Sequence, residues 1–348
     1  MEKIRLGIIF GSRSGEHEVS LMSATSVIKA AQSLNKYEIV TIGISRTGEW
    51  RLYKGDPDRI EQDTWFDAAE PLNPGDLKSV ADFALPILHG PYGEDGTIQG
   101  LFEMLDIPYG GCGVLASSVA MDKGVAKDVY KTAGLPICRH ILIYSEDFMD
   151  SREKTLCDIE KCLGWPVFVK PANMGSSVGV TKAKDAAALE KAILTAMEYD
   201  RRILIEEGLE VRELETSVIG NHSGNIAVAA VGEILPSDEF YDYHAKYQAG
   251  GASKLMIPAD ITEEQRENIK EMAKTAFKAV DCKGFARIDF FMDRNTNKIY
   301  INEINTIPGF TKFSMMPLLW AEAGVPYPEL IDRIVGFGYE RYYTKNRR

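Results

Sequence analysis

The sequence predicts an α/β protein built from three units. Its 348 residues exceed the usual size of a single domain, so two or three compact domains are expected. Short β-rich runs alternate with stretches of helical spacing from one end of the chain to the other. Glycine-rich loops follow several predicted strands, as in α/β folds whose loops gather at strand ends. We place the three units at residues 1–120, 121–210 and 211–348.

The first unit opens with a strand, a loop and a helix. Residues 4–10 are rich in apolar and β-branched side chains, residues 11–15 are typical of a loop, and residues 21–34 have helical spacing of apolar positions. Two more strands are predicted at residues 39–44 and 83–88. The second of them runs into a loop where repeated glycine and a proline exclude a regular element.

The second and third units continue the alternation. The second is expected to be small and mixed, with helices at residues 121–133 and 186–198 and strands at residues 165–171 and 203–207. The third is expected to contain a helix at residues 263–280 and strands at residues 214–219, 226–231, 284–291 and 299–305. Within it, residues 238–254 show no periodicity, which is typical of a lid loop over a site.

Composition argues against several classes of partner. A net charge of -11 would repel a phosphate backbone, so no nucleic acid is expected. No apolar run approaches the ~20 residues that span a bilayer, and the one at the N-terminus is too short for a signal peptide. We therefore expect a cytoplasmic protein with no membrane partner. The five cysteines, odd in number and without a C-x-x-C pair, are expected to be buried, reduced thiols.

Charged and amide side chains on two predicted strands form the strongest candidate site. Strand alternation places Arg287 and Asp289 on one face of their strand, and Glu303 and Asn305 on one face of the next. Two carboxylates and an amide supply the oxygen donors that suit Mg²⁺, which is usually shared with substrate phosphates. The alternative is that these charges only line a solvated strand edge.

A lysine followed by a small-residue loop is the second signal. Lys170 ends a predicted strand, and the Gly-Ser-Ser-Val-Gly loop at residues 175–179 includes Ser177, so its backbone amides could approach phosphate oxygens closely. Taken alone, such a loop is usually a turn. The chain has no P-loop motif. Further lysines suit phosphates, and glutamates suit nucleoside amino and hydroxyl groups: Lys123, Lys246, Glu206, Glu207 and Glu213.

Two other patterns in the sequence can signal a function. Residues 111–116 match the G-x-G-x-x-A pattern, yet they lie far along the chain and lack a clear ribose-binding acid on a second strand, so dinucleotide binding is not expected. The five histidines show no H-x-x-x-H spacing, which argues against a zinc site. Only His89, in a glycine-rich loop, is a functional candidate, and we expect it near a substrate.

Seven segments resemble, in order, the D-alanine–D-alanine ligases of the ATP-grasp superfamily. They are residues 11–20, 89–96, 121–123, 170–179, 240–247, 287–289 and 302–309. The resemblance covers nearly the whole chain. It implies a three-domain ATP-grasp architecture, with an N-terminal α/β domain and with ATP held between the central and C-terminal domains.

The resemblance also implies a role for each motif residue. Glu16 would hold the ammonium of the first D-alanine in a network with Ser176 and Tyr247. Arg287 and the Gly309 amide would face the tetrahedral carbon, where charge builds on oxygen. Neighbours of the second substrate would be Ser314 and Met315. Implied ATP contacts are Lys123, Lys170, Lys246, Glu206, Glu207, Leu209, Glu213 and Phe240. Two Mg²⁺ ions, with Mn²⁺ as a substitute, would bind Asp289, Glu303 and Asn305.

An acyl-phosphate mechanism follows from the same resemblance. The carboxylate of one D-alanine would attack the γ-phosphate of ATP, and the amine of the second would displace phosphate. The lid would close and exclude water, which would otherwise hydrolyse the intermediate. ATP and D-alanine are therefore the implied small-molecule partners, and a homodimer is the implied assembly. The hinge at residues 206–209 has no aromatic residue, unlike the hinges of some relatives. Its contacts with adenine are therefore expected to differ from theirs.

Other functions would share part of this pattern. A carboxylase or a glutathione-type ATP-grasp ligase would share the metal and lysine positions, but not residues 15–20 or 243–247. A non-catalytic nucleotide-binding protein would have lost a metal ligand or Arg287, and none is lost. D-serine is the nearest rival to D-alanine as second substrate, because an apolar pocket rejects one added hydroxyl by roughly 10²-fold at best.

Overall fold

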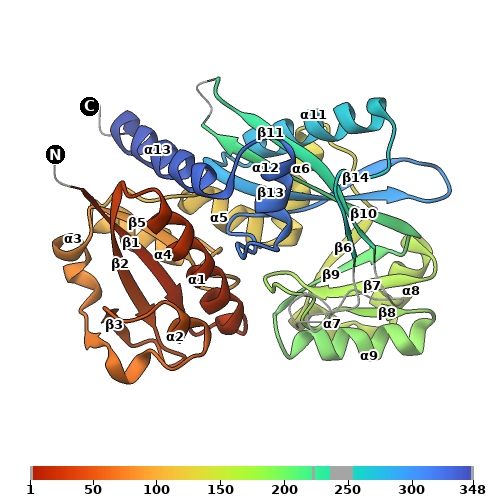
Figure 1. The fold of residues 1–348 in the computed structure, drawn as a ribbon. Coiled ribbons are helices and arrows are strands. Elements are labelled where there is room, and N and C mark those ends of the chain that lie inside the picture. The colour runs from red at the N-terminus through yellow and green to blue at the C-terminus, as the bar shows by residue number, and fades with distance from the viewer. Residues whose placement is uncertain (1–2, 222–223, 236–253, 346–348) are drawn as a thin grey trace.

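The computed structural model describes residues 3–221, 224–235 and 254–345. Three sheets organise these residues, and helices pack on each of them (Figure 1). In Figure 1 the first sheet lies at lower left, the second at lower right and the third along the top. In the described ranges, no helix is both long enough and apolar enough to cross a membrane.

The first sheet has the strand order β4-β3-β2-β1-β5. Its strands are β1 (Ile4–Gly11), β2 (Tyr37–Ile44), β3 (Trp50–Tyr53), β4 (Glu70–Pro71) and β5 (Phe83–Ile87). Its helices are α1 (His17–Ser33), α2 (Asp58–Glu61), α3 (Leu77–Val80) and α4 (Thr97–Met104), with 3-10 turns at Phe66–Ala68 and Pro74–Asp76. Because β1 runs parallel to β5, the loops that follow them meet at one edge. Glu16 and His89 come from these two loops.

The second sheet has the order β6-β9-β7-β8, with every neighbouring pair antiparallel. Its strands are β6 (His140–Tyr144), β7 (Val167–Pro171), β8 (Thr181–Ala183) and β9 (Arg202–Glu207). Its helices are α7 (Ser145–Asp150), α8 (Arg152–Leu163) and α9 (Ala186–Met197). The Asp185 carboxylate accepts from the Ala188 N–H and caps α9. Lys170 and Glu206 lie on the neighbouring strands β7 and β9.

The third sheet is antiparallel and has the order β12-β11-β10-β13-β14. Its strands are β10 (Val211–Gly220), β11 (Ala227–Leu235), β12 (Lys254–Met256), β13 (Gly284–Asp293) and β14 (Ile299–Asn305). The remaining helices of the described residues are α5 (Val114–Met121), α6 (Lys123–Thr132), α11 (Glu263–Ala279), α12 (Met315–Glu322) and α13 (Tyr327–Lys345). Thr262 and Gln265 form a capping box at the start of α11.

One hydrophobic core joins the first and third units. The same cluster of buried side chains contains Phe10 from β1, Phe285 from β13 and Trp320 from α12. The second sheet has a separate core, which includes Val169 and Ile193. The first and third units therefore form one packed body, whereas the second sheet packs around its own centre.

Helix α6 joins the core of the third sheet. Its residues Ala126 and Tyr130 are buried in the same cluster as β13, β14 and α11. The sequence placed this helix at the start of a second unit beginning at residue 121, whereas its packing ties it to the third. The spacing of apolar residues predicts that a helix is present but does not show which sheet its apolar face covers.

Several elements lay outside the sequence prediction. β14 has the predicted bounds, but β3, β4, β6 and α12 were not anticipated. Helix α12 (Met-Met-Pro-Leu-Leu-Trp-Ala-Glu) is apolar on nearly every side because it lies between β11 and α13, so it shows little amphipathic period. The β3 and β4 strands have only four and two residues, too short to show alternation.

The cysteines are unbridged, but not all are buried. All five lie in described residues and are free thiols, of which Cys157 and Cys162 on α8 are exposed. The expectation that all would be buried was wrong for these two, because α8 buries only its Ile159 and Leu163 positions against the second sheet. Cys112, in the G-x-G-x-x-A segment, is 1% exposed, and its Sγ faces the Lys283 carbonyl at 3.5 Å. That segment is part of the packed joint between units.

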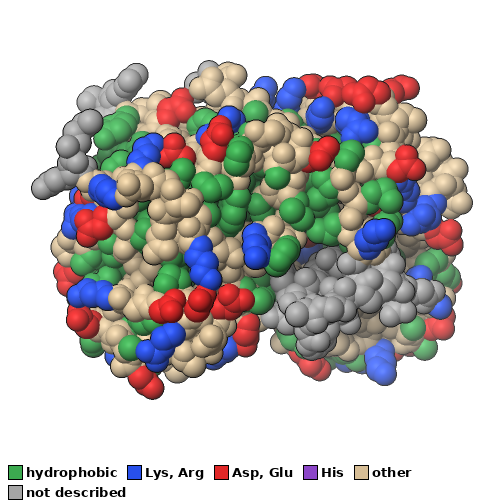
Figure 2. Space-filling model, viewed as in Figure 1, with side chains coloured by type: hydrophobic (Ala, Val, Ile, Leu, Met, Phe, Trp, Pro, Cys, Tyr) green, Lys and Arg blue, Asp and Glu red, His purple; other side chains and the backbone are tan. Residues whose placement is uncertain are grey.

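The visible face of the described residues carries both signs of charge. Figure 2 shows acidic and basic side chains interspersed, with acidic ones gathered along α11. No extended basic patch is visible there, which agrees with the net charge of -11.

Candidate active site

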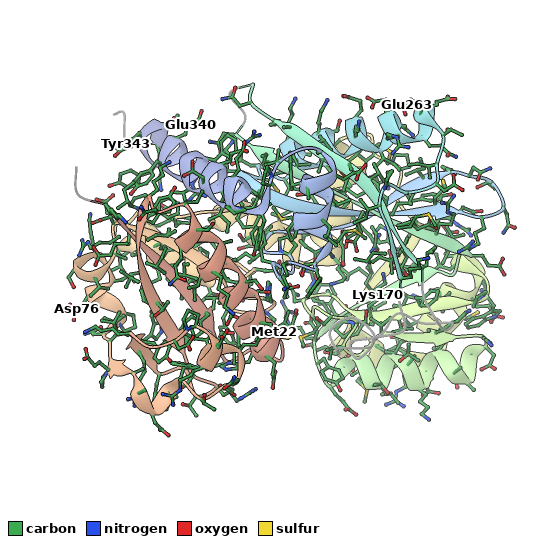
Figure 3. All side chains as sticks on the ribbon, viewed as in Figure 1. Met22, Asp76, Lys170, Glu263, Glu340 and Tyr343 are labelled. Carbon is green, nitrogen blue, oxygen red and sulfur yellow. The ribbon has the colours of Figure 1, made fainter. Side chains whose placement is uncertain are left out.

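A deep cleft of about 1490 Å³ lies where the three units meet. Met22 on α1 and Lys170 on β7 mark walls from the first and second units (Figure 3). Every motif candidate within the described residues lines it: Glu16, His89, Lys123, Lys170, Ser176, Ser177, Glu206, Glu207, Leu209, Glu213, Arg287, Asp289, Glu303, Asn305, Gly309, Ser314 and Met315. Phe240, Lys246 and Tyr247 lie outside the described residues. Of the lid expected at residues 238–254, only Lys254 is described.

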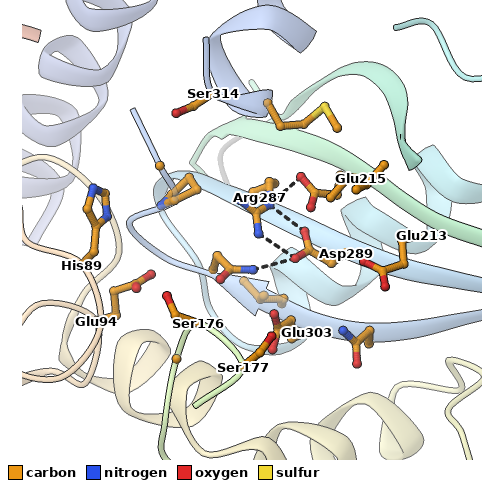
Figure 4. Close-up of a pocket in the computed structure, with 18 of the residues that line it drawn as sticks. His89, Glu94, Ser176, Ser177, Glu213, Glu215, Arg287, Asp289, Glu303 and Ser314 are labelled. Carbon is orange, nitrogen blue, oxygen red and sulfur yellow. Dashed lines mark hydrogen bonds and ion pairs between the residues drawn. The ribbon is translucent and has the colours of Figure 1, made fainter. Parts of the chain in front are cut away.

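An ionic network on β10 and β13 surrounds Arg287. Its Nε lies 2.9 Å from Glu215 Oε2 and donates to Asp289 Oδ1 at 2.8 Å, and its Nη2 donates to Asp289 Oδ2 at 2.7 Å. Glu215 and Asp289 are cross-strand partners, which places both carboxylates beside the guanidinium. In Figure 4, dashed lines run from Arg287 to both of these carboxylates. Paired with two carboxylates, the guanidinium is restricted to one orientation in the cleft.

Oxygen donors for a divalent cation lie beside this network. Asp289 and Glu303 are cross-strand partners on β13 and β14, and Asn305 Nδ2 donates to Asp289 Oδ2 at 2.9 Å. Lys123 Nζ lies 3.8 Å from Glu303 Oε2. Two carboxylates and an amide oxygen suit a hard cation such as Mg²⁺ or Mn²⁺. The described residues contain no group of three His, Cys, Asp or Glu side chains arranged for a metal, so the Asn305 amide would have to be the third donor.

Glu16 lies where two glycines leave room for its carboxylate. It precedes α1 as the N-cap residue and is 8% exposed. A Cβ on Gly90 would lie 2.7 Å from Glu16 Oε1, and a Cβ on Gly175 would lie 2.4 Å from it. The carboxylate is therefore enclosed between the loop after β5 and the loop after β7.

Two side chains of the loop after β5 hold the loop after β14. Glu94 accepts from the Ile307 N–H at 2.7 Å and from the Gly90 N–H at 2.9 Å. His89 Nδ1 donates to the Ile307 carbonyl at 2.7 Å, and its Nε2 lies 2.9 Å from Ser23 Oγ. Burial lowers the pKa of His89 to about 4, so the ring is neutral and Nε2 accepts from the hydroxyl. Both ring nitrogens of His89 thus contact protein groups.

Glu94 is expected to make stability depend on pH. Loss of hydration, reinforced by the charge of Glu16, raises its pKa from 4.5 to about 8. Between these pH values the native protein retains a proton that the unfolded chain releases, so the free energy of unfolding contributed by Glu94 falls as pH rises. We expect Glu94→Gln to remove this decline, measured by urea denaturation at about pH 5 and about pH 8.

The His89 contribution does not obscure this comparison. Its lowered pKa makes stability rise with pH, which is the opposite sign, and it is present in both proteins. The difference between wild type and variant therefore isolates Glu94. If wild type and Glu94→Gln lose the same free energy of unfolding between the two pH values, Glu94 is not the group that retains a proton in the native state.

The loop after β14 passes Gly309 and ends at α12. Ser314 is the N-cap residue of α12, and its Oγ accepts from the Thr311 N–H at 3.0 Å. A Cβ on Gly309 would come within 3.1 Å of Ser314 Oγ. Met315 is 5% exposed, and its Sδ packs against Gly232 of β11. Ser314 and Met315 therefore border the cleft beside Gly309.

The loop after β7 has an unusual backbone. Ser176 and Ser177 have positive φ angles of 50° and 59°, a left-handed conformation that costs energy for L-residues other than glycine. Hydrogen bonds from Val178 N–H to Gly175 O and from Val180 N–H to Ser177 O close the turns. Residues in such conformations cluster at ligand-binding loops.

Three lysines and two glutamates lie at or just behind the end of the cleft between the second and third sheets. Lys123 Nζ donates to the Met174 carbonyl at 2.6 Å. Lys170 pairs with Glu206, whose other oxygen lies 2.5 Å from Lys127 Nζ. Glu207 accepts from the backbone N–H of Arg139 at 2.8 Å and from its Nε at 2.7 Å. Glu206 and Glu207, two of the three glutamates expected at adenosine, are thus paired with cations.

Family models match both parts of the chain. The model described as "D-ala D-ala ligase N-terminus" matches residues 5–112, and that described as "D-ala D-ala ligase C-terminus" matches residues 129–336.

The chain belongs to the D-alanine–D-alanine ligase family.

Full-length relatives and solved structures agree with this assignment. The D-alanine–D-alanine ligase of Thermoanaerobacter sp. strain X514 is 46% identical over 100% of this chain and 99% of its own. That of Geobacillus kaustophilus is 45% identical over 99% of this chain and 96% of its own. The structure of the D-alanine–D-alanine ligase from Coxiella burnetii has a TM-score of 0.86 at 33% identity, covering 100% and 97%. That of the VanG D-Ala:D-Ser ligase from Enterococcus faecalis has a TM-score of 0.87 at 36% identity, covering 97% and 100%.

The resemblance read from the seven motifs is confirmed, and so is the fold class. The family's three-domain ATP-grasp architecture accounts for the three sheets and for the cleft between them. The individual roles of the site residues and the domain boundaries stay predictions.

Sequence reasoning did not single out several residues of this site. Glu94 and Glu215 lie in the cleft, and Lys127 lies behind it beside Glu206. Glu94 falls within a quoted motif, but nothing local shows that it binds a backbone N–H 213 positions away. For Glu215, its position two residues after Glu213, on the same strand face, was the available signal.

Proposed function

We propose that the protein is an ATP-dependent D-alanine–D-alanine ligase, which makes D-alanyl-D-alanine for peptidoglycan precursors through a D-alanyl phosphate. One observation carries the proposal: every described motif residue lines a single cleft, in a chain related to such ligases over its whole length. ADP and phosphate are the other products.

ATP is proposed to lie between the second and third sheets. Lys123 and Lys170 reach this part of the cleft and supply positive charge for the phosphates, with Lys246 from the lid. The loop that contains Ser177 supplies backbone amides. Proposed adenosine contacts are Glu206, Glu207, Leu209, Glu213 and Phe240.

Two Mg²⁺ ions, or Mn²⁺ in their place, are proposed at Asp289, Glu303 and Asn305. Such cations neutralise charge on the transferring phosphoryl group. Asp289 already accepts from Arg287 and Asn305, but two carboxylate oxygens offer about four lone-pair sites, so they can be shared with a cation. The donor set therefore fits the cations that the resemblance implies.

The first D-alanine is proposed to bind its ammonium at Glu16, in a network with Ser176 and Tyr247. Arg287 and the Gly309 N–H would face the oxygen that becomes negative when the second D-alanine attacks. Ser314 and Met315 would flank that second substrate. His89 contacts Ile307 and Ser23 through its ring nitrogens, so we propose that it supports the loop carrying Gly309.

The chemistry proceeds in two steps. A carboxylate oxygen of the first D-alanine attacks the γ-phosphorus of ATP, which forms D-alanyl phosphate and releases ADP. The neutral amine of the second D-alanine then attacks the acyl carbon, phosphate leaves, and the nitrogen loses a proton. The cleft must exclude water between these steps, because water would hydrolyse the acyl-phosphate.

Replacing Gly175 with alanine is expected to lower kcat/KM for D-alanine about tenfold to a hundredfold. The new Cβ would lie 2.4 Å from Glu16 Oε1, so the carboxylate has to move. Gly175 is not among the residues with positive φ, and its backbone therefore accepts alanine. Gly336→Ala on α13 is the matched control, because a Cβ there meets no atom within 4 Å. Equal steady-state rates in the two variants would contradict this placement of Glu16.

A homodimer in the cytoplasm is the proposed setting. The adjacent helices α4 and α5 expose Met104, Val114 and Leu115, an apolar group suited to a second copy of the chain. ATP and unbridged thiols both fit the cytoplasm. Sedimentation of the purified protein measures the assembly.

One observation favours D-serine as an alternative second substrate. The TM-score to the D-Ala:D-Ser ligase, 0.87, slightly exceeds that to the D-alanine–D-alanine ligase, 0.86. The sequence relatives at 46% and 45% identity are D-alanine–D-alanine ligases, however. The Met315 side chain would crowd the extra hydroxyl of D-serine and could not form a strong hydrogen bond with it. D-alanine is therefore the second substrate that we propose.

A competition experiment tests the function and the choice of substrate together. The enzyme receives ATP, Mg²⁺ and equal amounts of D-alanine, D-serine and D-lactate near neutral pH, and mass spectrometry identifies the products. We expect D-alanyl-D-alanine in the majority. If most of the product is a mixed dipeptide or depsipeptide, the choice of D-alanine as second substrate is wrong but the ligase activity stands. If no ATP-dependent product forms, the proposed ligase activity is wrong.

A further inference from the structure

Three charged side chains meet beneath the nucleotide end of the cleft. Glu206 on β9 lies between Lys170 on β7 and Lys127 on α6, with one carboxylate oxygen toward each ammonium. The Lys127 pair measures 2.5 Å. Side-chain exposure is 2% for Lys127, 4% for Glu206 and 12% for Lys170. This buried triplet lies outside the roles assigned by the motifs, because Lys127 belongs to none of them.

The two lysines differ in what else they can reach. Lys170 lines the cleft, together with Glu206, whereas Lys127 is not among the lining residues. Among the described residues, Glu206 is the one ion-pair partner found for Lys127. The Nζ atom of Lys127 has no other hydrogen-bond acceptor among those residues. Lys127 is therefore committed to Glu206. Lys170 is placed to exchange Glu206 for a ligand in the cleft.

Charge balance decides how such an exchange would work. Burial opposes the charge of Glu206, but Lys127 and Lys170 more than offset this and hold the pKa of its carboxyl well below the usual range. One carboxylate thus serves two ammonium groups. If Lys170 turned to a phosphate and left a buried carboxylate unpaired, the cost would be several kcal/mol. A second lysine on the far side of Glu206 removes most of that cost.

We propose that Lys127 is a positioning residue for nucleotide binding: it keeps Glu206 paired when Lys170 moves to the phosphates, and so sets the affinity for the phosphate part of the nucleotide. The inference rests on the proposed function, because it takes ATP as the ligand of this cleft. Without Lys127, Glu206 and Lys170 form an isolated neutral pair, and Lys170 stays with its partner. ADP and adenosine share the proposed contact of Glu206 with the adenosine part, so a comparison of the two ligands isolates the phosphate part.

The test compares ADP with adenosine as ligands of the full-length protein without D-alanine. Titration calorimetry, or competition against a fluorescent nucleotide, supplies Kd for each. In Lys127→Met, which keeps the length of the side chain but not its charge, we expect ADP to bind about tenfold more weakly, a loss of about 1.4 kcal/mol. Adenosine is expected to change by less than about threefold. The ratio of the adenosine Kd to the ADP Kd therefore falls.

Two control variants separate charge from structure. Lys131→Met removes an exposed lysine from the same helix and is expected to leave the ratio unchanged. Lys127→Arg keeps the cation and is expected to retain most of the ADP affinity. An unchanged ratio in Lys127→Met overturns the proposal, and so does equal weakening of both ligands, because that outcome assigns Lys127 a purely structural role.

A further variant decides the matter if Lys127→Met does not fold, as judged by circular dichroism. Glu206→Gln removes the shared anion and leaves both ammonium groups available, so the same ratio is expected to rise. A fall in the ratio would overturn the proposal. Failure of the proposed function has a different signature, since the wild-type protein would then bind neither ADP nor adenosine.

Discussion

Replacing Glu303 with glutamine is expected to lower turnover on the order of a thousandfold while the protein stays folded. Glu303 lies opposite Asp289 on the neighbouring strand and faces the cleft, where its carboxylate is proposed to bind the divalent cations. The amide has the same shape but no charge, so the charge that develops during phosphoryl transfer loses part of its compensation. The side chain is 29% exposed, which makes a large loss of stability unexpected.

Two measurements check the Glu303 prediction. Steady-state kinetics with ATP and D-alanine measure turnover, and binding of Mn²⁺ in the presence of ADP, followed by electron paramagnetic resonance, measures the cation directly. Glu322→Gln on the exposed end of α12 is the control and should keep both properties. Near-wild-type turnover in folded Glu303→Gln at ordinary Mg²⁺ would remove Glu303 from the metal site.

Arg287→Lys is expected to lower kcat about a hundredfold and to change KM for D-alanine much less. The guanidinium contacts Glu215 and Asp289 at the same time, through Nε and Nη2. A lysine ammonium is a compact point charge, so it cannot reproduce these paired contacts and also face the reacting carbon. The loss therefore falls on the transition state, where the oxyanion forms, rather than on substrate binding.

The division between kcat and KM is the informative readout for Arg287. Arg333→Lys on α13 replaces an exposed arginine that pairs with Glu329, and it should leave both parameters unchanged. If Arg287→Lys raises only KM, the residue contributes uniform binding of substrate and the oxyanion role is wrong. A thermal melt confirms that the network with Glu215 and Asp289 still supports the fold.

The ion pairs around Arg287 and Glu206 indicate how a ligand could take one partner of each group without changing the fold. Arg287 contacts two carboxylates, those of Glu215 and Asp289, and Glu206 has an ammonium at each of its two oxygens. In each case one partner is proposed to contact a ligand, Asp289 a cation and Lys170 a phosphate. The other partner, Glu215 or Lys127, keeps the central group paired. Such duplication limits the cost of leaving a buried charge alone.

The sequence alone determined the family and the fold class, and it named many of the residues that line the cleft. Strand alternation was enough to bring Asp289 and Glu303 toward each other, because a period of two is a local property and β13 and β14 are close in the chain. The motif residues were recognisable because their chemistry depends on residue type. The order of the motifs then identified the family, which the comparisons confirm.

Only the tertiary structure decided which distant groups meet. Glu94 and the Ile307 N–H are 213 positions apart, and nothing in the local pattern of either loop predicts their hydrogen bond. Glu16 is enclosed by Gly90 and Gly175 from loops of two units, and Lys127 is buried on Glu206 across the joint between α6 and β9. Such contacts arise when separate apolar faces pack together, and helix or strand periodicity reports which face is apolar but not what covers it. For the same reason, the sequence showed Lys127 only as one more lysine on a helix, while packing made it a buried partner of the site.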